Sequence, residues 1–165
     1  MKIAIISDVH DHRDNLHRCL EDIKNKWVDH IIHLWDYWAP WASVKPVLVL
    51  WIPVDGIFGN NDGEKRWIIK QFSVSEMHTI HRTVFGFVEL DWKKIFMSHF
   101  HDLAVPMAKS WDYDIVLYGH THIRDFRKIW KTIICNPWGV CWNFELASYA
   151  LYDSVDNTIA FIEKT

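Results

Sequence analysis

Side chains that could do chemistry occur in five short clusters, and each cluster follows a run of apolar residues. The clusters are Asp8-Val9-His10, Asp36, Gly59-Asn60-Asn61-Asp62, His99-Phe100-His101 and Gly119-His120-Thr121-His122. They supply carboxylates, imidazoles and carboxamides, which are ligands of divalent first-row metal ions. Residues i and i+2 of an extended chain point the same way, so each Asp-x-His or His-x-His pair can converge on one ion.

Each cluster taken alone has a plain structural interpretation. The Asn60 to Gly63 stretch is typical of a turn that leads into a helix N-cap, and an isolated Asp-x-His is common in loops. Their shared position at strand ends favours a common function. In α/β sheets, ligand crevices form at the carboxyl ends of strands.

The elements that must position these clusters can be predicted from the hydrophobic pattern. Leu16, Cys19, Leu20 and Ile23 are spaced as in an amphipathic helix over residues 13–26, between buried strands at 2–7 and 29–34. Further strands are expected at 47–50, 57–58, 83–90, 93–98, 115–118, 123–129, 132–135, 148–153 and 158–162, and helices at 63–72 and 104–110. The pattern predicts a layered, mixed α/β domain with helices outside.

Composition narrows the class of protein. The 165 residues suit one domain over 1–165, and no apolar run is long enough to span a membrane. The N-terminus lacks a signal-peptide pattern, so a cytoplasmic protein is expected. A net charge of −3 with scattered basic residues argues against dedicated nucleic-acid binding, although a small nucleotide substrate is compatible with it. Cys19, Cys135 and Cys141 lack zinc spacing and are expected to be free thiols.

The order of the clusters resembles the calcineurin-like metallophosphoesterase superfamily, and more narrowly its small single-domain archaeal and bacterial phosphodiesterases. The resemblance runs nearly end to end and includes Asp11-His12 and Asn136-Pro137. It implies a four-layer α-β-β-α sandwich of two mixed sheets with a dinuclear metal site at one edge. It also implies an enzyme that hydrolyses small phosphodiesters, or phosphomonoesters, with a water shared between two divalent ions.

The resemblance also implies a set of metal ligands. By motif position, one ion would be held by Asp8, His10, Asp36 and His122, and the second by Asp36 as a bridge together with Asn60, His99 and His120. Manganese is the expected metal, with iron, nickel, cobalt and zinc as alternatives, because selectivity depends on availability as well as on ligands. A structural zinc site is disfavoured because no thiolate is present in the set.

An alternative is a catalytically inactive scaffold of the same fold that binds other proteins, as in the retromer-coat relatives. All seven ligand positions carry competent residue types, which argues for the enzyme, because a scaffold has no reason to keep Asn60, His99, His120 and His122 together. A metal-storage or sensor protein would need an effector domain, which this short chain lacks. The physiological substrate and a homo-oligomeric state stay open.

Asn61 is one departure from the family pattern. Many relatives carry histidine there, where it can contact the phosphate or assist the leaving group. Asparagine cannot donate a proton in acid catalysis. The candidates near the reaction are therefore Asn61 itself and two histidines, His101 and His12, which could assist the leaving group or instead orient a ligand.

The eleven tryptophans are a second departure. Trp35 stands where the family has glycine before the bridging aspartate, and Trp92 stands in a hairpin connection where Asp-Gly is expected. Trp27, Trp111, Trp130, Trp138 and Trp142 occupy similar turn or helix-end positions. These positions are typical of glycine with positive φ, so strain is expected in several turns and beside the metal loop. An aromatic wall for the substrate is the alternative, while Trp41 and Trp67 fit ordinary core positions.

Overall fold

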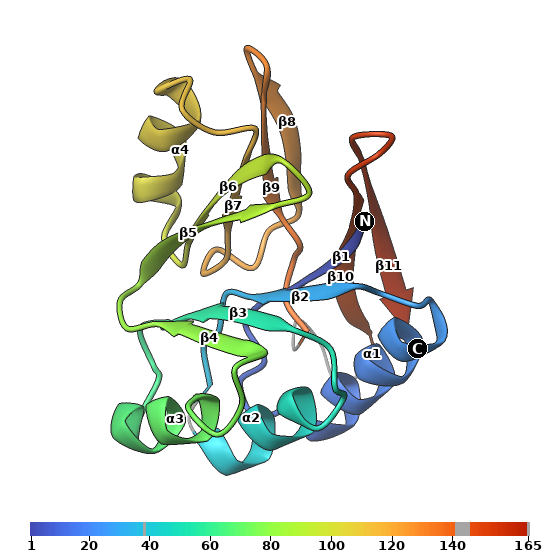
Figure 1. The fold of residues 1–165 in the computed structure, drawn as a ribbon, viewed down its shortest axis with the longest axis vertical. Helices are drawn as coiled ribbons and strands as arrows, with labels where there is room; N and C mark the ends of the chain where they lie inside the picture. Colours follow the sequence, from blue (N-terminus) through green and yellow to red (C-terminus); the bar gives the residue numbers. More distant parts are fainter. Residues whose placement is uncertain (38, 141–145, 165) are drawn as a thin grey trace.

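Two mixed β-sheets pack face to face in the computed structural model, which describes residues 1–37, 39–140 and 146–164 (Figure 1). The six-stranded sheet contains β1 (Lys2–Ile6), β2 (His30–His33), β3 (Val54–Ile57), β4 (His78–His81), β10 (Ala147–Asp153) and β11 (Thr158–Lys164). The five-stranded sheet contains β5 (Phe85–Leu90), β6 (Lys93–Ser98), β7 (Ile115–Tyr118), β8 (Asp125–Ile129) and β9 (Thr132–Asn136).

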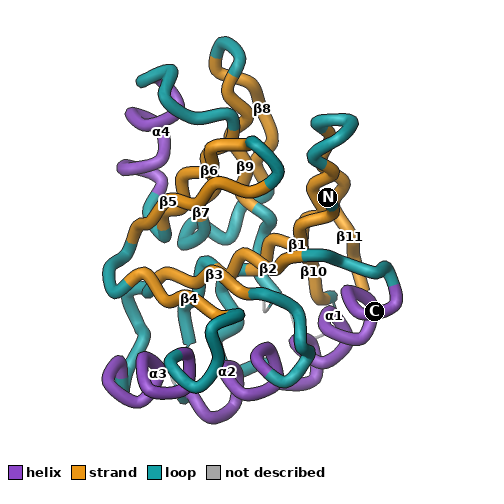
Figure 2. The backbone as a smooth tube through the Cα atoms, in the orientation of Figure 1, coloured by secondary structure: helices purple, strands orange, loops and turns teal. Residues whose placement is uncertain are grey.

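Helices cover the outer faces of both sheets. Figure 2 shows α1 (Arg13–Asn25), α2 (Pro40–Leu48) and α3 (Lys65–Phe72) along the six-stranded sheet, and α4 (His101–Lys109) beside the five-stranded sheet. The predicted α-β-β-α sandwich is therefore confirmed. Within the described residues, no helix has both the length and the apolar character needed to cross a membrane.

Strand order brings the predicted clusters to one edge. The six-stranded sheet runs β11-β10-β1-β2-β3-β4, and its strands β1 to β4 are parallel to one another. In the five-stranded sheet, of order β5-β6-β7-β9-β8, the strands β6, β7 and β9 are parallel. Since parallel neighbours end on the same side, the loops after β1, β2 and β3 meet at one edge, as do those after β6 and β7.

The core between the sheets keeps this edge rigid. Ile5 and Ile32 from one sheet pack in the same cluster as Met97, Leu117 and Ile133 from the other, and all five are at most 1% exposed. Burying one such side chain contributes about 1.5–3 kcal/mol. The thiols of Cys19 and Cys135 are likewise buried and free, whereas Cys141 lies outside the described residues.

The predicted strand at residues 47–50 is wrong, because Val47 and Leu48 form the last turn of α2. Pro40 in the first turn favours a helix start, and the buried residues of α2 include Val44 and Val47 at helical spacing. A short apolar run does not distinguish a strand from a buried helix segment. The third strand instead lies at Val54–Ile57, and neither α2 nor β4 was among the expected elements.

Seven tryptophans have backbone dihedrals in the left-handed region, which confirms the expectation for all six described turn positions and adds Trp51. Their φ values run from 35° to 76°, at Trp27, Trp35, Trp51, Trp92, Trp111, Trp130 and Trp138. Trp142 lies outside the described residues. No glycine of the described chain has a positive φ. A bulky L-residue in this region costs roughly 1–2 kcal/mol.

A buried aspartate joins three strands of the six-stranded sheet. Asp55 Oδ2 lies 2.8 Å from His30 Nε2, and Asp55 Oδ1 lies 3.0 Å from His81 Nε2. Burial raises the pKa of Asp55, but the hydrogen bonds from the two histidines outweigh it and hold this pKa below its usual value. Residue spacing does not predict this cluster, because its members lie far apart in the chain.

Replacing Trp92 by glycine is expected to stabilise the protein. Trp92 has a φ of 63° and is 88% exposed, so glycine relieves the backbone without loss of buried surface. A gain of about 1 kcal/mol would raise Tm by about 2–4 °C in thermal unfolding. Trp41→Gly in α2, at a residue 64% exposed, is the matched control and should lower Tm. If the Trp92→Gly protein has a Tm no higher than that of the wild type, the backbone at Trp92 is not strained.

Asp55→Asn is expected to lower the free energy of unfolding by about 3 kcal/mol at neutral pH, because the buried His30 and the half-buried His81 lose a charged acceptor. The folded pKa of Asp55 lies below the reference value of 3.8, so its contribution is complete above that pH and is lost on acidification. Urea denaturation should therefore show the two proteins converging below about pH 4. Equal free energies of unfolding for the wild type and Asp55→Asn at neutral pH would show that the pairs of Asp55 with His30 and His81 do not stabilise the fold.

Candidate metal centre

Two buried carboxylates lie at the centre of the edge where the strand ends meet. Asp8 follows β1 and is 0% exposed, and Asp36 follows β2 and is 1% exposed. The Asp8 N–H donates to the Trp35 carbonyl at 3.0 Å, and the His10 N–H donates to the Asp36 carbonyl at 3.0 Å. These backbone bonds fix the two loops side by side.

The four residues predicted to hold the first ion come together. Ligand atoms of Asp8, His10 and His122 all lie within 4.8 Å of one another. His122 Nε2 is 3.4 Å from Asp8 Oδ1, and His10 Nε2 is 3.1 Å from His122 Nε2. His10 Nε2 is also 3.5 Å from Asp36 Oδ2, which connects this group to the second carboxylate.

The residues predicted for the second ion gather on the other side of Asp36. His99 Nε2 lies 3.8 Å from Asp36 Oδ2 and 2.9 Å from Asn60 Oδ1. The ring centroid of His120 lies 5.1 Å from that of His99. Asp36 Oδ2 is thus near histidines of both groups, which is the position that a bridging ligand requires.

The electrostatics of this edge favour a cation. Ligand atoms of Asp8, Asp36 and His99 lie within 4.8 Å of one another, and all three residues are buried. Burial raises the pKa of Asp8 to about 7; hydrogen bonds from Ser7 Oγ and the His120 N–H oppose this, and the charge of Asp36 adds to it. Two carboxylates this close are both ionised only when positive charge compensates them. The donor set of carboxylates, imidazoles and an amide oxygen fits divalent ions.

His99 is prepared as a neutral ligand. Its Nδ1 lies 3.0 Å from the Leu34 carbonyl oxygen, and a proton shared with this acceptor leaves the lone pair of Nε2 beside Asn60 Oδ1, where both atoms could bind one ion. Burial lowers the pKa of His99 to about 4, against the opposing charge of Asp36. The imidazole therefore stays uncharged at neutral pH.

Hydrogen bonds from neighbouring side chains orient the acidic residues. The Asn61 N–H and Nδ2 donate to the two oxygens of Asp36, at 2.7 and 3.0 Å. Asp62 accepts from the Gly59 and Tyr37 N–H groups, at 2.6 and 2.9 Å, which closes the loop after β3. Ser7 and Asp62 were not predicted as site residues, although Asp62 belongs to the Gly59 to Asp62 cluster.

Asn136 supports the histidine loop after β7. Its Nδ2 donates to the Gly119 carbonyl and to Thr121 Oγ1, both at 3.0 Å. The backbone of His120 and His122 in this loop is left-handed, with φ of 67° and 52°. The Asn136-Pro137 pair was noted in the sequence, and the structure shows what its asparagine contacts.

The three candidates for assisting catalysis lie in different places. Asn61 donates a hydrogen bond to Asp36, the predicted bridging ligand. His101 begins α4. Its ring centroid lies 5.1 Å from that of Tyr118, and its Nε2 lies 3.4 Å from a guanidinium nitrogen of Arg127. His12 precedes α1 and lines a surface hollow with Arg13 and other residues. Asn61 is thus the candidate that the fold brings to the centre.

Trp35 packs against the loop that carries Asp36. Its indole is 0% exposed and stacks on His33 with centroids 3.5 Å apart, and within the described chain its Nε1 has no hydrogen-bond partner. A Cβ at Gly56 would lie 2.4 Å from that Nε1, so only glycine leaves room for the ring. Trp35 and Asp36 both have positive φ, 35° and 111°. Strain is therefore concentrated beside the carboxylate that connects the two groups.

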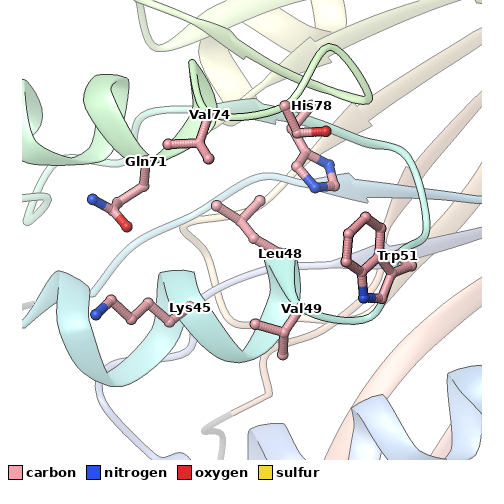
Figure 3. Close-up of a pocket in the computed structure, with 8 residues that line it drawn as sticks. Lys45, Leu48, Val49, Trp51, Gln71, Val74 and His78 are labelled. Atoms are coloured by element: carbon pink, nitrogen blue, oxygen red, sulfur yellow. The ribbon is translucent and has the colours of Figure 1, made fainter.

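A separate pocket lies between α2 and α3. Figure 3 shows Leu48, Val49, Trp51, Val74 and His78 around it. Lys45, Gln71 and Ser75 complete its lining. It contains none of the predicted ligands, so it is not the site where these groups could act together.

Comparison with protein families and curated proteins agrees with this geometry. The model of the calcineurin-like phosphoesterase superfamily domain matches residues 1–157. The phosphodiesterase MJ0936 of Methanocaldococcus jannaschii is 36% identical over 147 residues, which cover 86% of this chain and 85% of that protein.

Solved structures of phosphoesterases also superimpose on this chain. A structure described as a novel archaeal phosphodiesterase superimposes with a TM-score of 0.87 at 31% identity, covering 99% of this chain and 100% of its own. Yfce, a phosphoesterase from E. coli, superimposes with a TM-score of 0.68 at 22% identity and 98% coverage of both chains, a likeness in fold.

Proposed function

The chain belongs to the calcineurin-like phosphoesterase superfamily, and we propose that it is a phosphodiesterase that works with two divalent metal ions. Its class, a phosphoesterase that hydrolyses ester bonds, follows from the family and from the relative with phosphodiesterase activity in its name. The observation that carries the dinuclear proposal is the position of Asp36, whose Oδ2 lies 3.5 Å from His10 Nε2 and 3.8 Å from His99 Nε2.

Seven side chains would hold the ions. Asp8, His10 and His122 would bind one, Asn60, His99 and His120 the other, and Asp36 would contact both. Divalent ions in such a site supply positive charge for the phosphoryl oxygens and lower the pKa of a coordinated water towards ~7. Manganese is the proposed metal, with iron, nickel, cobalt and zinc as alternatives.

The chain's own groups prepare this site and leave it accessible. Asn60, Asn61 and His120 are exposed, so a small phosphoester can reach the second group of ligands from solvent. Ser7 is 1% exposed, and its hydroxyl donates to Asp8 Oδ2 at 2.6 Å. Ser7 therefore orients Asp8 and is not available as a nucleophile.

The inactive-scaffold alternative is less well supported. All seven ligand positions carry competent side chains, and the fold gathers them at one edge despite the left-handed backbone of Asp8, His10, Asp36, His120 and His122. Such conformations cost about 1–3 kcal/mol each and cluster at functional sites. A protein-binding surface would not require this arrangement.

Removing metal is expected to abolish activity and lower stability together. After dialysis against EDTA, hydrolysis of bis(4-nitrophenyl) phosphate should stop and return on addition of Mn²⁺, with the other cations tested in parallel. Metal at a hundred times its Kd should stabilise the fold by about 2.7 kcal/mol, seen as a rise in Tm.

Asp36→Asn should reduce activity by more than about 100-fold and weaken the metal-induced rise in Tm. Asp156→Asn is the control, because Asp156 is exposed in the turn between β10 and β11 and should leave both quantities unchanged. Metal-free protein that hydrolyses the diester as fast as the loaded form would refute metal dependence.

Reaction rates are expected to follow the acidity of the leaving group. Asn61, which contacts Asp36, cannot donate a proton, so aryl phosphodiesters should react much faster than alkyl ones. The measurement is log kcat/KM against leaving-group pKa, which should fall steeply. Asn61→His should make this slope shallower. If His12 or His101 acts as the general acid, its replacement by alanine would make the slope steeper. Equal rates on alkyl and aryl esters would contradict the prediction.

A further inference from the structure

The strand β5 forms an open edge of the five-stranded sheet. It pairs with β6 on one side, and no strand within the described residues lies on its other side (Figure 1). The carbonyl oxygen of Val84 accepts a hydrogen bond from the His99 N–H across the pair, at 2.9 Å. Because bonded and non-bonded positions alternate in an antiparallel pair, the backbone groups of Phe85, Phe87 and Glu89 point away from β6.

The outer face of β5 is apolar and uncovered. Phe85 is 46% exposed and Phe87 is 69% exposed. The helix α4 covers β6, β7 and β9 of the same sheet rather than β5. Beneath α4 the aromatic side chains continue inward, since Phe85 stacks on Phe96 with centroids 6.2 Å apart and Phe96 lies 5.3 Å from Tyr113. The core under α4 therefore runs out to an open strand edge.

The other three sheet edges are blunted. β4 has only four residues, and β8 carries Arg127 and Lys128. The exposed residues of β11 are small or charged. Short strands and charged side chains are the usual devices that keep an edge from pairing with another chain. β5 has six residues, two exposed aromatic rings and Glu89 as its single charged side chain.

We propose that β5 pairs antiparallel with β5 of a second copy of this chain, so that the two five-stranded sheets become continuous across a two-fold axis. Thr83 Oγ1 contacts the N–H and the carbonyl oxygen of Phe85, so the backbone groups of Phe87 and Glu89 are the ones open to a partner. An axis at Phe87 places the two Phe87 rings side by side and Phe85 opposite Glu89. An axis at Glu89 would bring the two carboxylates together, which is destabilising.

The area of the exposed rings sets the expected affinity. A phenylalanine contributes about 150–250 Å² when buried, so the two rings offer roughly 200–300 Å² per protomer. Standard interfaces bury about 800 Å² per partner, so the backbone of β5 and its flanks supply most of the contact. We expect a dimer with a Kd in the micromolar range, and its formation requires neither metal nor substrate.

Sedimentation equilibrium of the full chain tests the pairing at protein concentrations from about 1 to 200 μM, which bracket a micromolar Kd. The wild type should approach twice the mass of one chain at the upper end. Phe87→Lys places two ammonium groups at the axis and should raise the Kd at least about tenfold. Phe126→Lys is the matched control, because Phe126 is 47% exposed on the edge strand β8 and its replacement should leave association unchanged.

A cysteine at the axis tests the register. Directly paired residues of antiparallel strands have Cα atoms about 4.5–5.5 Å apart, which is within reach of a disulfide. Phe87→Cys should therefore form an intermolecular disulfide on oxidation, whereas Glu89→Cys, which is displaced from the axis, should not. The wild type oxidised in parallel measures any bridge from the native cysteines.

A wild type that stays monomeric over the whole concentration range would overturn self-pairing and leave β5 as an edge for a different chain. A Phe87→Lys protein that associates as well as the wild type would also overturn it. The Phe87→Cys cross-link is the second measurement if the lysine variant fails to fold. A dimer in which Glu89→Cys cross-links and Phe87→Cys does not would refute the axis at Phe87.

Discussion

The repulsion between two buried carboxylates is the constraint on which this structure depends. A carboxylate oxygen of Asp8 lies within 4.8 Å of one of Asp36, and both side chains are almost completely excluded from water. Hydrogen bonds from Ser7, Asn61 and the backbone reduce the cost of this arrangement but add no positive charge. Burial lowers the pKa of His99 and of His122, so these two imidazoles add no positive charge at neutral pH. Bound cations would supply the compensating charge, and the donors around the carboxylates are those that cations bind.

The two sheets provide the rigidity that such a centre requires. Five strand ends deliver side chains to one edge, and residues with positive φ turn the chain sharply at three of them, as at Asp8, Asp36 and His120. Strained loops persist only when their surroundings determine them fully. The core between the sheets and the backbone bonds between the loops after β1 and β2 do this here.

Much of this could be predicted because the signals are local. Short apolar runs indicated most strands, and the polar residues directly after them indicated the clusters, among which the family resemblance implied the seven ligands. What failed was non-local or ambiguous. The run at Val47 fits a strand or a helix end, and only packing of α2 decides between them. Asp55 meets His30 and His81 through strand pairing that no sequence spacing reveals. His12 and His101 share a residue type with the ligands, but not their position.

Asn136 has a consequence that reaches beyond support of a single loop. One of its amide atoms restrains the loop of His120 and His122, and the other restrains the backbone of Trp138. A single planar amide cannot rotate to suit one partner without disturbing the second. A shift of either segment is therefore passed to the other through this one side chain.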